Sequence, residues 1–281
     1  MTRIAVVTDS SAYLPEELVR EHGIHIIPLN VHFNGSVYKD LVEIREEEFF
    51  RRLAAASELP STSQPSAGEF AEVFRQAAQG ADGVVAIVLS SGLSGTYSSA
   101  MTARDMLPDI PIEVVDSRTT SMGLGFLALA AARAAREGKS LDEIRSLLES
   151  IIPRIHVWFV LDTLKYLAKG GRIGGAQALM GSVLSIKPIL QVEGGRVEQL
   201  DKVRTRGKAV DRMVELFKRE VDGRPVHCSI INTLALGEAE QLKARVQADF
   251  PQVQDMMITG VSAAIGTHVG PGALGLCFYA E

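Results

Sequence analysis

The sequence predicts an α/β protein with two domains, and two observations lead to that prediction. Over the first two thirds of the chain, short runs rich in Val and Ile alternate with amphipathic stretches, which is typical of a parallel sheet covered by helices. After about Pro153 this alternation gives way to a hairpin pattern and an α+β arrangement. We therefore expect an N-terminal parallel-sheet α/β domain over residues 1–155 and a C-terminal α+β domain with a mixed sheet over residues 156–281.

The elements of the first domain have local sequence signals. Asn34-Gly35 between alternating residues indicates a hairpin over 31–40, and Ser66 with Glu69 has the spacing of a helix capping box. Strands are expected where β-branched residues dominate, at 4–10, 24–31, 83–90 and 112–117. Helices are expected at 13–23, 43–57, 66–80, 96–107, 122–137 and 141–152.

The second domain is expected to begin with a strand that leads into a helix over 156–164. A glycine-rich turn follows at 169–175, and Glu-Gly-Gly centres a hairpin at 188–200. The remaining helices are expected at 206–219 and 237–249, and the remaining strands at 225–232, 253–259 and 273–280. Strands of this kind, mixed with helices, predict a second sheet distinct from the first.

The bulk composition excludes several classes of protein. The chain is 46% hydrophobic and 22% charged with a net charge of −5, which argues against a nucleic-acid partner. Its two cysteines, Cys228 and Cys277, belong to no CxxC motif, as is usual in a reducing compartment. The most apolar window, 122–132, ends at Arg133 and is too short for a bilayer, and the N-terminus does not resemble a signal peptide. These features predict a cytoplasmic protein without stable membrane insertion.

Small polar residues follow three predicted strands, at 8–11, 90–92 and 116–117, where ligands of parallel sheets bind. The second group opens the segment SSGLSGTY, a strand-to-helix turn without the lysine of a phosphate loop. Gly92, Ser94 and Gly95 also fail the G-x-S-x-G spacing of a nucleophile elbow, because the second glycine comes one place early. Three roles stay open for Ser94: a helix cap, a ligand-binding hydroxyl or a nucleophile.

Other polar segments are candidates for binding. Thr62 lies too early to cap the helix that starts after Ser66, so its hydroxyl is free for another role. The turn KGGRIGG carries Lys169 and Arg172. In KVRTRGK, at 202–208, basic residues at alternate positions would share one face of an extended segment, either as a guarded sheet edge or as a surface for an anion or a partner.

His268 lies between glycines in GTHVGPGALG, and we expect it in a loop. A histidine in such a segment is more typical of a site than of a core. No second His or Cys stands at metal-ligand spacing, so no metal site is expected.

Eight segments, taken in order along the chain, resemble the DegV family of bacterial proteins. They are TDSSAYLP (8–15), STSQPS (61–66), SSGLSGTYSSA (90–100), VDSRTTSMGLG (115–125), LKYLAKGGRIGG (164–175), IKPILQVEGG (186–195), KVRTRGKA (202–209) and GTHVGPGALG (266–275). The resemblance implies a two-domain protein that buries one long-chain fatty acid between its domains and needs no other cofactor. It also implies a non-catalytic role as the fatty-acid-binding subunit of bacterial fatty acid kinase, whose separate ATP-binding subunit phosphorylates the carboxylate to acyl phosphate for phospholipid synthesis.

The same resemblance implies roles for individual residues. Thr62 of STSQPS and Ser94 of SGLSGT, with the Gly95 amide nearby, are expected to bind the fatty acid carboxylate. Arg172 and His268 are expected to join the polar network around this head group. Hydroxyls and an amide supply the hydrogen bonds that a buried carboxylate needs.

Arg204 of the KVRTR segment is implied to work with the kinase subunit. Binding energy is expected to come from the apolar tail, since each buried CH₂ contributes ~0.8 kcal/mol and a chain of roughly 14 methylenes offers on the order of 11 kcal/mol gross. Association and ordering costs subtract from that sum.

Two other classes of function compete with a carrier. A serine hydrolase acting on lipid esters would use Ser94 and His268, although the elbow spacing is against it. A phosphate- or nucleotide-binding enzyme would need the missing loop lysine or a G-x-G-x-x-G motif, and the sequence has neither.

Overall fold

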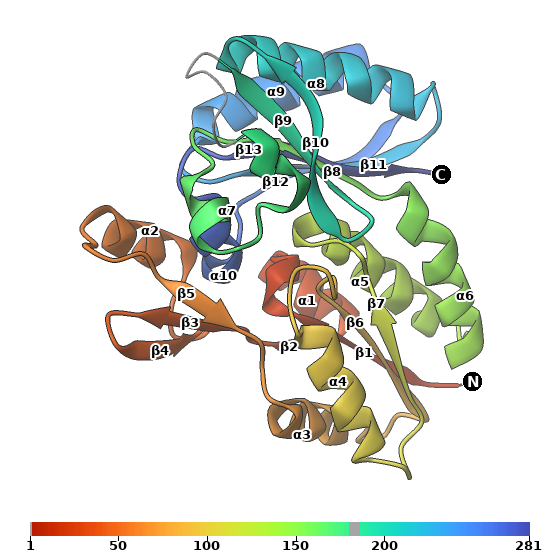
Figure 1. The fold of residues 1–281 in the computed structure, drawn as a ribbon. Coiled ribbons are helices and arrows are strands. Elements are labelled where there is room, and N and C mark those ends of the chain that lie inside the picture. Colours follow the sequence, from red (N-terminus) through yellow and green to blue (C-terminus); the bar gives the residue numbers. More distant parts are fainter. Residues whose placement is uncertain (1, 180–185) are drawn as a thin grey trace.

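The computed structural model describes residues 2–179 and 186–281 and contains two large sheets and one small one (Figure 1). The first large sheet has four parallel strands in the order β2-β1-β6-β7. These strands are β1 (Ile4–Asp9), β2 (His25–Ile27), β6 (Gly83–Val88) and β7 (Ile112–Asp116). The parallel sheet predicted for the first half of the chain is confirmed.

The second large sheet has six strands in the order β10-β9-β8-β13-β11-β12, of which only β11 and β12 pair in parallel. The strands are β8 (His156–Val160), β9 (Lys187–Glu193), β10 (Arg196–Val203), β11 (Val226–Asn232), β12 (Val253–Thr259) and β13 (Leu274–Ala280). This sheet is mixed, as predicted, and Gly194-Gly195 turns the β9–β10 hairpin with positive φ at both residues.

The third sheet contains β3 (Asn30–Phe33), β4 (Ser36–Lys39) and β5 (Ser61–Ser63), paired in the antiparallel order β4-β3-β5. The β3–β4 turn is the predicted Asn34-Gly35 hairpin. The sequence pattern does not predict a strand where β5 lies. Its Ser-Thr-Ser sequence has no apolar alternation, and it is a strand because its backbone pairs with β3, with Thr62 opposite Val31.

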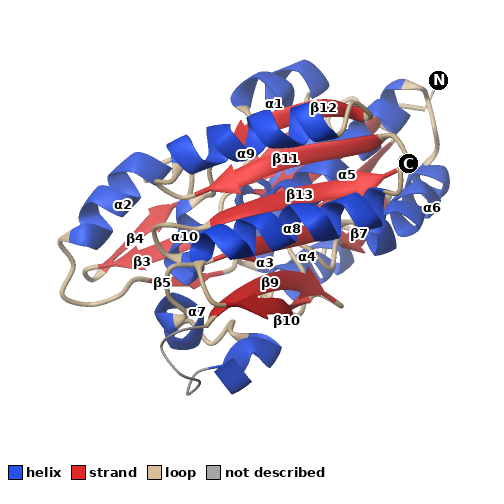
Figure 2. Ribbon diagram, turned by 90° about the horizontal axis from the view of Figure 1, so that it is seen from above, coloured by secondary structure: helices blue, strands red, loops and turns tan. Residues whose placement is uncertain are grey.

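Helices separate and cover the large sheets in layers (Figures 1 and 2). On the four-stranded sheet, α3 (Ala67–Ala77) and α4 (Thr96–Asp105) cover one face, and α5 (Ser121–Arg136) and α6 (Leu141–Ile151) cover the other, with α1 (Glu16–His22) packed against α5. On the six-stranded sheet, α8 (Arg206–Val221) and α9 (Leu236–Asp249) cover the face turned away from α5.

Helix α5 lies between the two large sheets and contacts strands of both. Its small residues make this close approach possible: a Cβ added to Gly123 would lie 2.9 Å from a Val157 methyl of β8 and 2.5 Å from Thr119 Oγ1. Gly125 is in similar contact with Leu14 and Met122. These glycines therefore serve close packing, and one continuous hydrophobic core runs from β1 through α5 to β13.

Three further α-helices are short: α2 (Glu46–Ala54), α7 (Lys165–Lys169) and α10 (Ala263–Val269). Short 3₁₀ helices lie at Ser10–Ala12, Ile152–Arg154 and Gly174–Leu179. The expectation that His268 lies in a loop is wrong, because it belongs to the last turn of α10. This helix has only seven residues and is held by tertiary contacts. Ser262 Oγ accepts a hydrogen bond from Ile265 N, and Gly266 packs against the rings of Phe49 and Phe50.

The basic residues at 202–208 do not share one extended face, because β10 ends at Val203 and α8 begins at Arg206. Arg206 is paired with Asp162 and Glu238. The boundary after residue 155 stays a prediction, although it coincides with the passage from the elements of the first sheet to β8. Within the described residues, no helix is both long and apolar enough to cross a membrane.

Candidate functional site

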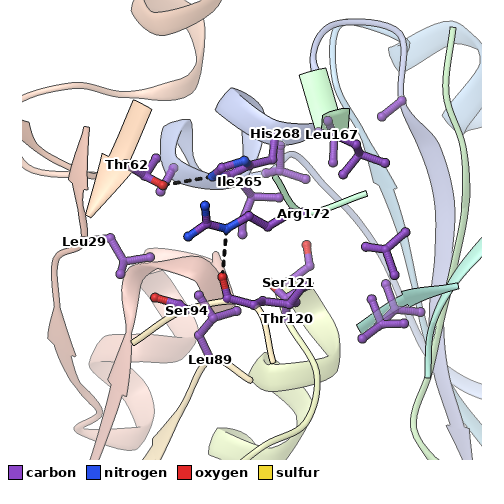
Figure 3. A pocket seen from close by; sticks show the side chains of 18 of the residues that line it. Leu29, Thr62, Leu89, Ser94, Thr120, Ser121, Leu167, Arg172, Ile265 and His268 are labelled. Atoms are coloured by element: carbon purple, nitrogen blue, oxygen red, sulfur yellow. Dashed lines mark hydrogen bonds between the residues drawn. The ribbon is translucent and has the colours of Figure 1, made fainter. Parts of the chain in front are cut away.

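A pocket lies between the two large sheets, and side chains from both of them form its wall (Figure 3). Most of its wall is apolar. The apolar lining residues are Leu29, Leu89, Leu93, Val157, Phe159, Leu167, Val192, Val197, Ile231, Val261, Ala264, Ile265, Val269 and Ala273. They come from both halves of the chain, so the pocket exists only when the sheets are packed together.

Four polar side chains on this wall, Thr62, Ser94, Arg172 and His268, form what we call the polar cluster. Thr62 Oγ1 and His268 Nε2 are 2.9 Å apart and hydrogen-bonded (Figure 3). Strand β5 positions the threonine and α10 positions the histidine. Ser94 Oγ is 2.8 Å from Thr96 Oγ1 and also accepts from the Thr96 amide at 3.3 Å, so this hydroxyl lies at the start of α4.

Two backbone carbonyls hold Arg172 in the polar cluster. Its Nε donates to Leu93 O at 3.0 Å, and its Nη1 donates to Gly170 O at 2.7 Å. His268 also explains the first glycine of KGGRIGG, because a Cβ on Gly170 would lie 2.1 Å from His268 Nδ1. The imidazole therefore packs directly on the glycine backbone, and the turn places the guanidinium and the histidine together.

His268 is neutral at physiological pH. Burial, together with the positive charge of Arg172, lowers its pKa to about 4. The polar cluster thus has one permanent positive charge, two hydroxyls and a neutral imidazole. This arrangement suits an anion with a single negative charge, which would also raise the pKa of His268 when it arrives.

Two of the predicted site residues do not line the pocket. Gly95 is the N-cap of α4 and packs against the Gln64 side chain, which itself lines the pocket. Arg204 is exposed in the connection between β10 and α8. Sequence reasoning also missed Asn232 of β11, which lines the pocket. Its side-chain Nδ2 donates to Thr259 O.

Thr120 and Ser121 line the pocket and were not singled out from the sequence either. A signal for them was present, since they follow the strand β7 whose carboxyl end carries Asp116 and Ser117. These two polar residues immediately precede or begin α5.

The polar residues at 8–11 are scaffolding rather than part of the pocket wall. Asp9 is fully buried and accepts from Ser11 N at 2.9 Å and from Leu89 N at 2.6 Å, although burial raises its pKa. Ser10 Oγ donates to Asp40 at 2.6 Å, and Asp40 faces the first amides of α10. These carboxylates fix Leu89, which directly follows β6, and the helix that carries His268.

A contact between the two halves of the chain fixes the SSGLSGTY segment. Ser90 Oγ donates to Gly195 O at 2.8 Å, at the tip of the β9–β10 hairpin. Both glycines in this contact are required for it, because a Cβ on Gly92 would lie 2.5 Å from Gly195 O and one on Gly195 would lie 2.5 Å from Ser90 Oγ. The hairpin tip therefore rests on the turn that presents Ser94.

Comparison with known proteins identifies the chain. A family model described as "Uncharacterised protein, DegV family" matches residues 3–281. The protein belongs to the DegV family. It is 41% identical over 274 residues to a DegV domain-containing protein of Streptomyces coelicolor, covering 97% of each chain.

Solved DegV family structures have the same fold. A structure from Thermus thermophilus, described as showing fatty acid binding of a DegV family protein, has a TM-score of 0.95 and 35% identity and covers 100% of both chains. The structure of DegV from Bacillus subtilis, described as a fatty acid binding protein, has a TM-score of 0.93 and 37% identity, again over 100% of both chains. The fold predicted from the sequence is confirmed by this likeness.

The geometry does not support a serine hydrolase in this DegV family member. That mechanism needs the histidine to take the proton of the serine, within hydrogen-bond reach of its Oγ. His268 Nε2 pairs instead with Thr62, while Ser94 Oγ pairs with Thr96.

Among residues 2–179 and 186–281, no group of three or more His, Cys, Asp or Glu side chains is arranged to hold a metal ion.

Proposed function

We propose that this protein binds one long-chain fatty acid, with the carboxylate at the polar cluster and the tail along the apolar wall, between the predicted domains 1–155 and 156–281. The observation that carries the proposal is that Thr62, Ser94, Arg172 and His268 lie near one another in the wall of a mostly apolar pocket (Figure 3). The names of the structural neighbours agree with this ligand class. Tail burial supplies the affinity, and the polar cluster fixes the orientation.

The carboxylate would be bound by hydroxyl and amide hydrogen bonds together with one positive charge. Thr62 and Ser94 donate hydroxyl hydrogen bonds, with the Gly95 amide as the further donor expected near them, and Arg172 supplies the positive charge. Thr62 can donate its single hydroxyl hydrogen to the carboxylate when His268 Nε2 carries a proton and donates to Thr62 Oγ1, because the hydroxyl oxygen then accepts from the imidazole.

The ligand is tested by extracting lipid from protein purified out of bacteria and analysing it by mass spectrometry. We expect one fatty acid per protein chain. Protein that contains no fatty acid and takes up none when it is offered contradicts the proposal. In titrations, removing two methylenes from the chain should weaken binding roughly 15-fold, because about 1.6 kcal/mol of burial is lost.

The polar cluster is tested with Thr62→Val, which keeps the shape of the side chain and removes its hydroxyl. We expect weaker binding of the fatty acid. Binding of the alkane of the same length, which has no carboxylate, should be unchanged. Thr102→Val, at an exposed position of α4, is the matched control and should bind like the wild type. Equal fatty acid affinity in the two variants would show that the Thr62 hydroxyl does not bind the carboxylate.

We further propose that the bound carboxylate is presented to a separate ATP-binding kinase subunit, in the cytoplasm, for conversion to the acyl phosphate that feeds phospholipid synthesis. In this role the chain itself is not catalytic. Arg204 is exposed and outside the pocket, as a docking residue must be. Arg204→Ala should therefore keep fatty acid binding and lose acyl phosphate formation when kinase and ATP are added.

The control for docking is Arg219→Ala, an exposed arginine near the other end of α8. It should leave both binding and phosphorylation unchanged. Acyl phosphate formation at the wild-type rate with Arg204→Ala would exclude the docking role of that residue while leaving the fatty acid proposal intact.

A further inference from the structure

A second polar point lies in the pocket, at the start of α5. Thr120 and Ser121 are 8% and 2% exposed, and both residues line the pocket. Neither hydroxyl has a hydrogen-bond partner among the described residues. Buried hydroxyls almost always have partners, so two adjacent ones that face a ligand pocket without any indicate that the ligand supplies them.

The backbone conformation at these residues is of a kind that is common at binding sites. Ser121 has a φ of 55°, a left-handed conformation that is unfavourable for serine and is common at functional sites. Thr120 is the N-cap of α5, yet its side chain caps no amide. The two hydroxyls are therefore not used to satisfy the end of the helix.

The second polar point is distinct from the polar cluster. Thr62 and His268 belong to β5 and α10, whereas the first turn of α5 packs on β8, with Gly123 against Ile155 and Val157. In Figure 3, Ser121 lies on the opposite side of Arg172 from Thr62 and Ser94. A chain that leaves the polar cluster along the apolar wall of β8 would pass these hydroxyls.

We propose that Thr120 and Ser121 bind a hydroxyl group carried within the acyl chain, so that the preferred ligand class is a hydroxylated long-chain fatty acid. This rests on the proposed function. A plain chain would place methylenes against two buried hydroxyls and leave them unpaired, whereas a chain hydroxyl can donate to one and accept from the other. The positive end of the 16-residue helix α5 favours an oxygen at this position.

The experiment uses full-length protein stripped of lipid. Binding is measured for octadecanoic acid and for a series of hydroxyoctadecanoic acids in which the hydroxyl is moved along the chain. We expect one position of the hydroxyl to bind about fivefold or more tightly than octadecanoic acid, the effect of about one hydrogen bond. The double variant Thr120→Val with Ser121→Ala should lose this preference while binding octadecanoic acid at least as well as the wild type.

The matched control is Thr102→Val with Ser98→Ala, the same two changes at exposed positions of α4, which should keep the preference. A wild type that binds octadecanoic acid but prefers no hydroxylated isomer overturns the inference and leaves the proposed function standing. So does a preference that survives in the double variant. If the double variant weakens octadecanoic acid itself, the hydroxyls serve the carboxylate and the inference is also wrong. A wild type that binds none of the acids refutes the proposed function as well.

Discussion

Replacing His268 by glutamine should make the protein less sensitive to acid. Burial and Arg172 lower the pKa of His268 from 6.5 to about 4 in the folded protein. Because folding lowers the pKa of this base, its contribution to the stability of the folded state is fully present above the unfolded pKa of 6.5. That contribution is lost as the pH falls from 6.5 toward the folded pKa of about 4. The unfolded chain takes up the proton first, so acid favours unfolding in the wild type. Glutamine cannot be protonated and can keep a donor near Thr62.

The size of this effect follows from the two pKa values. At 1.36 kcal/mol per pKa unit, the contribution of His268 to stability falls by about 2 kcal/mol between about pH 7 and about pH 5, and by about 3 kcal/mol when the pH reaches 4. Asp40 acts in the opposite direction, since its pKa is raised from 3.8 to about 6 by burial. Both proteins contain Asp40, so the difference between wild type and variant isolates His268.

The assay is urea unfolding of lipid-free wild type and His268→Gln at about pH 7 and about pH 5. The free energy of unfolding should fall more for the wild type, by about 2 kcal/mol. Equal pH dependence in the two proteins would refute the claim that His268 is buried as a neutral base beside Arg172. Bound fatty acid should reduce the difference, because its carboxylate raises the pKa of the histidine.

Three further predictions concern glycines. Gly170→Ala should displace the imidazole of His268, since the new Cβ would lie 2.1 Å from Nδ1, and should weaken fatty acid binding at least 10-fold in a titration with little loss of helix content. Gly195→Ala should destabilise the protein by about 1–3 kcal/mol in urea unfolding, because it combines a φ of 85° with a clash against Ser90 Oγ. Gly207→Ala, in α8 with open space around it, should instead raise the free energy of unfolding by up to about 1 kcal/mol; destabilisation there would show that Ala substitution is harmful for another reason.

The sequence predicted the two large sheets and their covering helices because hydrophobic periodicity reports burial directly. Runs such as 83–88 are buried at every position, and the capping box of Ser66 and Glu69 marks the start of α3 as expected. The elements that escaped prediction are stabilised by distant residues. Strand β5 depends on pairing with β3, and α10 depends on Asp40 and on the rings of α2.

The candidate site was predictable in part. Residue type and local position drew attention to Thr62, Ser94, Arg172 and His268, the family resemblance assigned them to one head group, and the structure brings these four to one pocket. Their pairing was not predictable, because the contact of Thr62 with His268 depends on how β5 and α10 pack. Local pattern could not separate pocket-lining polar residues from buried scaffolding such as Asp9, since both follow buried strands.

The hydrogen bond between Thr62 and His268 joins residues 206 positions apart in the chain. During synthesis on the ribosome, the four-stranded sheet is complete once β7 has emerged, long before the helix that carries His268. A nascent chain can therefore form its first sheet while the pocket between the two large sheets is still incomplete. A complete pocket therefore shows that synthesis has passed α10, and a chain that ends before α10 lacks both the histidine and the part of the pocket wall that this helix supplies.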